Sequence, residues 1–263
     1  MHMLFILSPA KSLDYTTPVA KTVPHTLPQF TAQSAQLIDI LTTQSPQDIA
    51  RLMHLSDALS ALNVARYAAW SPKFTAKNSR QAILAFNGDV YDGLNASTLK
   101  VDDLQWAQQH IGMLSGLYGV LRPLDYMQPY RLEMGTALPN AQGANLYKFW
   151  GTQLADYINA YFNTRLAVEK TPTVVNLASQ EYFKSVDRKV LKARVVECVF
   201  EDHKNGDYKV ISFFAKRARG LMARYVIDKR ITTVKKLQSF HSDGYAFAAA
   251  QSAPDRLVFR RKL

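Results

Sequence analysis

Runs of apolar residues alternate with amphipathic stretches along this chain of 263 residues. Short aliphatic or β-branched runs bounded by turn residues predict buried strands, and apolar residues spaced three and four apart predict helices. The predicted strands lie at 3–7, 81–86, 173–177, 190–200, 208–214 and 257–261. The predicted helices lie at 30–42, 46–53, 56–70, 101–111, 146–162 and 215–229.

Turn chemistry sharpens two of these boundaries. Ser45 is a good N-cap and Pro46 suits the first helical position, so a helix should begin there. The dipeptide Asn205-Gly206 between two apolar runs predicts a tight β-hairpin. Helices and strands alternate without a regular βαβ rhythm, and the last strands look antiparallel. The pattern therefore favours an α+β fold, in which one compact domain over 1–263 holds a mixed sheet flanked by helices.

Composition excludes several classes of protein. Hydrophobic residues make up 48% of the chain and charged residues 20%, which is typical of a globular protein with a real core. The one cysteine, Cys198, excludes an internal disulfide and a four-cysteine metal site, and its apolar surroundings predict a buried, inert thiol. The six histidines are scattered, with no HxH or HxxxH pair, so neither a metal site nor a cofactor is predicted.

The hydropathy pattern predicts a cytoplasmic protein. No apolar stretch approaches the roughly 20 residues of a membrane helix, so no membrane partner is expected. The N-terminal segment also lacks the charged start of a signal peptide.

The charge is concentrated in one part of the chain. Residues 186–263 hold 18 Lys and Arg against 8 Asp and Glu, whereas the first 185 residues hold 14 against 13. Nearly all of the formal net charge of +11 therefore lies in this basic C-terminal portion, 186–263. Such a field attracts polyanions, of which nucleic acid is the commonest. A basic surface that serves only solubility is the alternative.

A turn bracketed by glycines lies at 111–121, in the segment IGMLSGLYGVL. It resembles the hairpin of helix-hairpin-helix motifs, where backbone N–H groups face a phosphate and glycine permits the close approach. The spacing from Gly116 to Gly119 is one residue longer than usual, and Pro123 limits a second helix. Ser115, Gly116, Gly119 and Arg122 are therefore candidate DNA-binding residues, and a packed turn with glycines at close contacts is the alternative.

The densest basic segment, 216–225, falls on a predicted helix. Like charges on one helical face repel by a few tenths of a kcal/mol per pair, so an anionic partner would relieve that cost. The cations Lys216, Arg217, Arg219 and Arg224 complete the candidate set for double-stranded DNA. A merely solvated helical face is the alternative.

Polar side chains gather where predicted strands end. Such positions often build sites, and a set of acid, base and cationic groups there suits an anionic small molecule. The same residues could equally cap helices or pin loops, and no nucleophile and base pair can be assigned. The candidate pocket residues are Ser8, Lys11, Asp89, Tyr91, Arg131, Glu133, Asn176, Ser179, Glu181 and Lys184.

Five segments together resemble the YaaA peroxide-stress family. They are MLFILSPAKSLDY, ILAFNGDVYDGL, MLSGLYGVLRPLDYMQPYRLEMG, NLASQEYFKSV and ISFFAKRARGLMARYVI, and the likeness runs from Met3 to about Tyr245. The resemblance implies a bacterial cytoplasmic protein that protects cells during peroxide stress and lowers free intracellular iron. It also implies an α+β fold with a basic cleft and a helix-hairpin-helix-like element that binds DNA. Asn87 departs from the Lys that the family segment is expected to carry.

Two functions fit these observations. The first is binding of double-stranded DNA, including distorted DNA, in a peroxide-stress protein that helps to limit iron-driven damage. The second is an enzyme that acts on a nucleotide or another anionic small molecule. A closed polar pocket would favour the enzyme, and an open basic groove would favour DNA. The sequence argues against direct iron storage, because it has neither the carboxylate and histidine repeats nor the cysteine cluster that such a protein needs.

Overall fold

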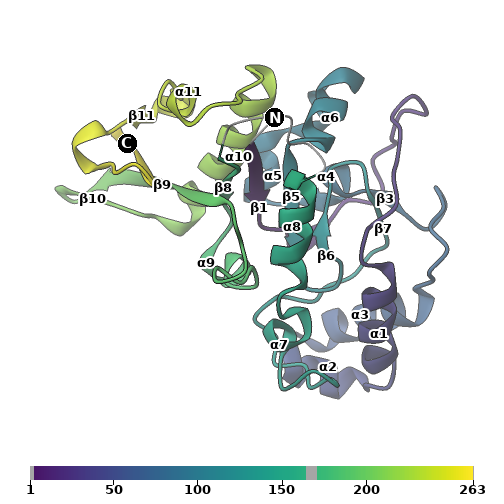
Figure 1. Ribbon diagram of the computed structural model, residues 1–263. Coiled ribbons are helices and arrows are strands. Elements are labelled where there is room, and N and C mark those ends of the chain that lie inside the picture. The colour runs from purple at the N-terminus through teal and green to yellow at the C-terminus, as the bar shows by residue number, and fades with distance from the viewer. Residues whose placement is uncertain (1–2, 164–170, 263) are drawn as a thin grey trace.

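The computed structural model describes residues 3–163 and 171–262 and arranges them around a mixed eight-stranded sheet (Figure 1). The strand order is β11-β12-β9-β8-β1-β5-β6, with β10 paired to β9. The α+β class and the single domain with helices flanking a mixed sheet are confirmed. The strands are β1 (Met3–Leu7), β5 (Ile111–Ser115), β6 (Gly119–Leu121), β8 (Thr173–Leu177), β9 (Arg194–Lys204), β10 (Asp207–Lys209), β11 (Ala246–Phe247) and β12 (Arg256–Lys262).

Five neighbouring strands of this sheet run parallel, namely β5, β1, β8, β9 and β12. Numbered along the chain, their order is 2-1-3-4-5, so the direction of strand addition reverses beside β1. In parallel sheets ligands bind outside the carboxyl ends of the strands at such a reversal. The prediction of antiparallel final strands holds for the β9–β10 hairpin and for β11 with β12, but it is wrong for β12 with β9, which pair in parallel.

Helices surround the sheet, and Figure 1 shows α1, α2, α3 and α7 gathered at the end of the molecule far from β10 and β11. In the described ranges no helix is both long and apolar enough to cross a membrane. The helices are α1 (Thr31–Thr42), α2 (Pro46–Met53), α3 (Asp57–Ala69), α4 (Ala82–Ala85), α5 (Asp89–Leu94), α6 (Val101–Gln108), α7 (Leu146–Trp150), α8 (Gln153–Asn163), α9 (Gln180–Phe183), α10 (Ser212–Asp228) and α11 (Val234–Leu237), with short 3₁₀ turns η1 (Ala96–Thr98), η2 (Ser242–Gly244) and η3 (Ala249–Gln251).

The predicted start of α2 is confirmed. Ser45 Oγ accepts a hydrogen bond from the Asp48 backbone N–H at 3.2 Å, and the Ser45 N–H donates to Asp48 Oδ2 at 3.1 Å. This reciprocal pair is a capping box, which satisfies backbone groups that the first turn leaves without partners. The local sequence therefore fixed this boundary without help from the rest of the fold.

Other boundaries differ from the predicted ones. The predicted strand at 81–86 is helix α4 between the two-residue strands β3 (Arg80–Gln81) and β4 (Phe86–Asn87), which pair with β7 (Tyr126–Met127) and β2 (Ser12–Leu13). The predicted helix at 146–162 is broken into α7 and α8 at Gly151, whose φ of 47° lies in the left-handed region. The apolar run at 208–214 splits because α10 begins at Ser212.

The glycine-bracketed turn is a buried β-hairpin, which corrects the prediction of a helix-hairpin-helix-like element. Strands β5 and β6 pair antiparallel, with Ser115 opposite Gly119. A Cβ at Gly116 would lie 2.3 Å from the Leu132 carbonyl oxygen, and one at Gly119 would lie 2.8 Å from the Trp150 ring. Both glycines thus serve close packing, and Ser115, Gly116 and Gly119 are buried inside the protein.

Candidate functional site

Two segments that the sequence placed far apart meet at the carboxyl edge of the sheet. Ser8 follows β1 and Ser179 follows β8, and these strands are parallel neighbours. Ser8 Oγ accepts a hydrogen bond from the Ser179 N–H at 2.8 Å, and the two hydroxyls are 3.4 Å apart. The Tyr91 hydroxyl donates to the Ser8 carbonyl at 3.0 Å. Asp89, in the first turn of α5, begins the helix that carries Tyr91.

Glu133 pairs with Arg131 in its own loop and with Lys11 in the loop after β1. Glu133 accepts from Arg131 NH2 at 3.0 Å through one oxygen and from Lys11 Nζ at 2.8 Å through the other. The Lys11 side chain is 63% exposed and Arg131 is 17% exposed. Exposed ion pairs contribute little to stability, so the pair between Lys11 and Glu133 mainly positions the loop after β1. Of the two roles left open for Arg131 and Glu133, the geometry favours loop pinning.

Glu181 and Lys184 anchor α9 to its neighbours. Glu181 Oε1 accepts from the Gly135 N–H at 3.0 Å, and the Glu181 carbonyl accepts from the Tyr147 hydroxyl at 3.0 Å. The Lys184 ammonium lies 5.0 Å from the centre of the Tyr147 ring, within the range of a cation–π contact. The polar clusters that the sequence separated therefore converge around the ends of β1 and β8.

Three buried tyrosines complete this edge: Tyr91, which the sequence predicted, and Tyr130 and Tyr182, which sequence reasoning missed. Burial raises the pKa of Tyr91, Tyr130 and Tyr182 above the ordinary value. The Tyr130 hydroxyl lies 2.6 Å from Ser115 Oγ, at the end of β5. Since these phenols stay protonated at neutral pH, they can serve as hydrogen-bond donors and not as bases. Their spacing in the sequence gave no sign that they would gather.

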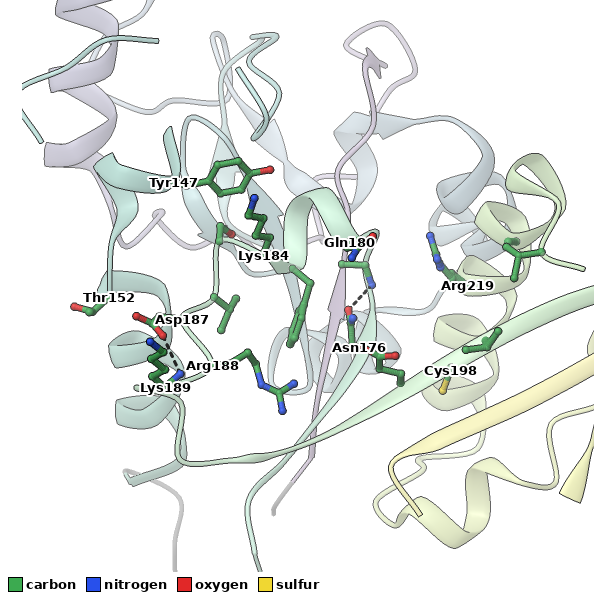
Figure 2. A pocket seen from close by; sticks show the side chains of 18 of the residues that line it. Tyr147, Thr152, Asn176, Gln180, Lys184, Asp187, Arg188, Lys189, Cys198 and Arg219 are labelled. Atoms are coloured by element: carbon green, nitrogen blue, oxygen red, sulfur yellow. Dashed lines mark hydrogen bonds between the residues drawn. The ribbon is translucent and has the colours of Figure 1, made fainter. Parts of the chain in front are cut away.

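A cavity of about 940 Å³ borders this cluster, between α7, α9 and α10 and over the strands β8 and β9 (Figure 2). Three predicted site residues line it: Asn176 and Lys184 from the pocket set, and Arg219 from the DNA set. The predictions had kept those sets apart. The cavity joins them because α10 passes over β9, which lies next to β8.

The walls of the cavity carry more positive than negative charge. Its lining contains two carboxylates, Asp187 and Glu197. The cations outnumber them, and they come from α7, from α9 with the loop that follows it, and from α10: Lys148, Lys184, Arg188, Lys189 and Arg219. Opposite charges attract more strongly in a partly dehydrated space than in bulk water. The arrangement therefore suits an anionic ligand.

Arg219 is the least compensated of these cations. Its Nε is buried and has no hydrogen-bond partner, and it forms no ion pair with a carboxylate in the described parts of the chain. Burial is the main cause that lowers the pKa of its guanidinium, and the Cys198 thiol lies near enough to oppose that shift slightly. In Figure 2 the side chain extends from α10 on the side of the cavity opposite Tyr147 and Lys184.

Cys198 forms part of the cavity wall and is 5% exposed. Burial raises the pKa of the thiol to about 12. Because the thiolate is the reactive species, we expect iodoacetamide at pH 8 to alkylate the native protein at least ~100-fold more slowly than the urea-unfolded chain. Mass spectrometry of timed samples measures both rates, and comparable rates would contradict a buried, inert thiol.

The remaining predicted DNA-binding residues fall into two groups. Arg224 pins α10 to a neighbouring segment, since it donates to Thr98 Oγ1 at 2.6 Å and to the Asn95 carbonyl at 3.1 Å, and it also bonds Asp228 of its own helix at 2.9 Å. Arg122 bonds Asp125 at 3.0 Å within its own loop. Lys216 and Arg217 are exposed on α10. The second group, Lys216 and Arg217, is thus the more exposed one, whereas Arg122 and Arg224 are half-buried and paired with carboxylates.

Comparison with known proteins covers nearly the whole chain. A family model described as "Peroxide stress protein YaaA" matches residues 3–251. A UPF0246 protein of Albidiferax ferrireducens is 65% identical over 260 residues, which is 99% of this chain and 98% of that protein. Similar relatives are a UPF0246 protein of Bordetella petrii, 65% identical over 260 residues (99% and 100% covered), and one of Ralstonia pickettii, 62% identical over 261 residues (99% and 100% covered).

Proposed function

The chain belongs to the YaaA family of peroxide stress proteins, and from that premise we propose that it acts by binding double-stranded DNA, including distorted DNA. Bound in this way, it would help to limit iron-driven oxidative damage to the DNA. The proposed effect on iron is indirect, and the proposed place of action is the cytoplasm.

The observation that carries this proposal is a group of exposed cations around the cavity. Lys184, Arg188 and Lys189 are exposed and line the cavity on the side of α9. Lys216 and Arg217 are exposed on α10, next in sequence to Ala215 of the cavity wall. Within the described residues none of the five enters a salt bridge. We call these five residues the basic rim.

Several arginines of the basic C-terminal portion pair with neighbouring carboxylates instead. Arg194 bonds Asp255 at 2.5 Å, and Arg260 bonds Glu201 at 2.8 Å. The rim cations have no carboxylate partner among the described residues, so their charge is available to another molecule. Lys and Arg contacts to phosphates supply affinity without reading sequence, so binding should be led by the DNA backbone.

Removing two rim charges should weaken DNA binding and flatten its salt dependence. We expect the double variant K216A/R217A to bind a labelled duplex at least ~10-fold more weakly at 0.15 M salt. Each phosphate contact releases counterions from the DNA, and that favourable release is lost with the contact. The slope of log K against log salt concentration should shrink by roughly 2, at about 0.9 per phosphate. Fluorescence anisotropy at four salt concentrations measures both quantities.

The matched control is K73A/K77A, which removes two exposed lysines from the loop after α3. It should bind like the wild type. Binding by the wild type that does not change between low and physiological salt would overturn the proposal, and so would equal losses in the two double variants.

A second candidate function rests on the polar side chains that converge around the carboxyl ends of β1 and β8. Asn176 and Lys184 belong both to that cluster and to the lining of a cavity large enough for a small ligand. The alternative proposal is therefore an enzyme that acts on a nucleotide or another anionic small molecule at the strand ends, beside Ser8 and Ser179. Binding of such a molecule with no measurable affinity for duplex DNA would favour it over the first proposal.

A further inference from the structure

An unpaired guanidinium in a cavity wall destabilises the protein unless a ligand supplies a negative charge and a hydrogen-bond acceptor. A buried charge without a partner loses its hydration and gains nothing in return. Arg219 is partly in that position: the residue is half-buried, its Nε is sealed from solvent without an acceptor, and no described carboxylate pairs with it. An anion inside the cavity would supply the missing acceptor. Planar oxyanions such as carboxylate and tetrahedral ones such as phosphate both fit the fork of arginine donors.

The rest of the wall distinguishes between these anions. Phe183 and Val199 supply an apolar surface at the side of α9 and β9, which a simple phosphate or carboxylate would leave unused. Asn176 is 8% exposed, and its Oδ1 already accepts from the Ala178 N–H at 2.9 Å. Its amide NH₂ group bonds no other described residue, so it can donate to a ligand in the cavity that Asn176 lines. Gln180 adds a second amide beside it (Figure 2).

We propose that this cavity is a nucleotide site, in which Arg219 binds the phosphate, the apolar wall packs against the base, and the amides of Asn176 and Gln180 contact the base edge. A volume of about 940 Å³ lies in the range of small-molecule sites and leaves room for one nucleotide. Amide side chains and an apolar wall are the groups with which proteins hold a single base outside a duplex.

The nucleotide can come from two sources. It is either a free mononucleotide or an unpaired nucleotide of a distorted duplex, and the second source rests on the proposed DNA-binding function. Phe213 bears on this choice, because its side chain is 58% exposed in the first turn of α10, between Val210 and Ala215 of the cavity wall. An exposed aromatic ring at that place could stack against the bases that flank an extruded one.

The decisive experiment compares three proteins, namely wild type, R219M and the control K229M. Lys229 is exposed at the C-terminal end of α10 and lies outside the cavity lining, so its loss removes one charge from the same helix. Isothermal titration with dAMP and with inorganic phosphate measures the free-ligand source. We expect R219M to bind dAMP about 10- to 100-fold more weakly than either other protein, which is the typical cost of a lost charge-assisted hydrogen bond. Inorganic phosphate should bind the wild type more weakly than dAMP does.

The DNA arm uses an intact duplex and the same duplex with one unpaired adenine. If the nucleotide comes from DNA, the wild type and K229M bind the bulged duplex more tightly, and R219M loses that preference. If the wild type binds neither duplex, the proposed DNA function is refuted. The dAMP titration then tests the nucleotide site by itself. Equal affinity of wild type and R219M for dAMP and for the bulged duplex would overturn the nucleotide site.

Thermal unfolding without ligand separates a binding role from a structural one. Since the guanidinium pairs with no carboxylate in the described ranges, R219M should melt no lower than the wild type. A clearly lower melting temperature would show that Arg219 stabilises the fold, and that result would also overturn the proposal.

Discussion

Replacing Gly220 by alanine is expected to lower the free energy of unfolding by about 3 kcal/mol or more, the upper range for overpacking a well-packed interior. Gly220 lies where α10 crosses α5, and a Cβ there would lie 1.7 Å from the Val90 carbonyl oxygen and 2.9 Å from the Leu94 nitrogen. Gly93 on the facing helix is equally tight, since its Cβ would lie 2.2 Å from the Arg217 carbonyl oxygen. The two helices touch backbone to backbone, so no side-chain rotation can make room.

The sign of this effect is informative, because helix propensity alone predicts the opposite. An alanine inside a helix is about 1 kcal/mol more favourable than a glycine. For a chain of this length, a loss of 1 kcal/mol lowers the melting temperature by roughly 2–4 °C, so G220A should melt ~10 °C below the wild type. Thermal unfolding followed by circular dichroism measures the change.

Gly135 provides the matched control. A Cβ there would meet only the flexible end of the Glu181 side chain, at 3.2 Å, so G135A should melt within a few degrees of the wild type. A G220A variant as stable as the wild type would mean that α5 and α10 can separate at little cost. The position of α10, and with it the place of Arg219 over β9, would then be less firmly fixed than the contacts indicate.

The elements that the sequence predicted well are those whose signals are local. The strands at 3–7 and 173–177 have the bounds of β1 and β8, because continuous apolar runs of five residues suit strands that are buried on both faces. The turn Asn205-Gly206 joins β9 to β10 with both residues at positive φ, as a two-residue hairpin requires. Neither prediction needed a distant part of the chain.

The errors arose where distant contacts decide the outcome. In the segment 111–121, Gly116 and Gly119 bracket a turn, which fits either a phosphate-binding hairpin or a packed one. The choice depends on Leu132 and Trp150, which occupy the space that side chains at Gly116 and Gly119 would need. The pairing of β12 beside β9 likewise depends on partners about 60 residues apart, which periodicity cannot reveal.

The candidate site was predicted in pieces. Polar residues after β1 and β8 were identified because strand ends are readable in the sequence, and parallel pairing then brings Ser8 to Ser179. The cavity was not predicted, because it depends on how α9 and α10 stand over the sheet. Arg219 was counted among surface cations, and nothing in a basic helix distinguishes the one arginine that faces inward.

The second large effect is expected at Asp202, whose loss should cost about 3–5 kcal/mol, the usual result when one partner of a buried ion pair is removed. Asp202 is fully buried, and its Oδ1 accepts from Arg261 Nε at 2.7 Å. The Tyr245 hydroxyl donates to its Oδ2 at 2.9 Å. Arg261 also bonds Asp243 at 2.6 Å, so this network ties β9, β12 and η2 together behind α10. In D202A the Arg261 guanidinium, 10% exposed, loses its buried partner.

A double-mutant cycle separates the pair from its surroundings. R261M should also be strongly destabilised, because the Asp202 side chain would keep only the Tyr245 hydroxyl as a partner among the described residues. The double variant D202A/R261M should lose clearly less stability than the sum of the two single losses, because it leaves no unpaired buried charge. Urea unfolding monitored by tryptophan fluorescence gives all four free energies. Strict additivity would mean that Asp202 and Arg261 act independently. The strands β9 and β12 would then be held together by their backbone ladder and apolar packing alone, and the buried charges would have no part in fixing where the C-terminal strand pairs.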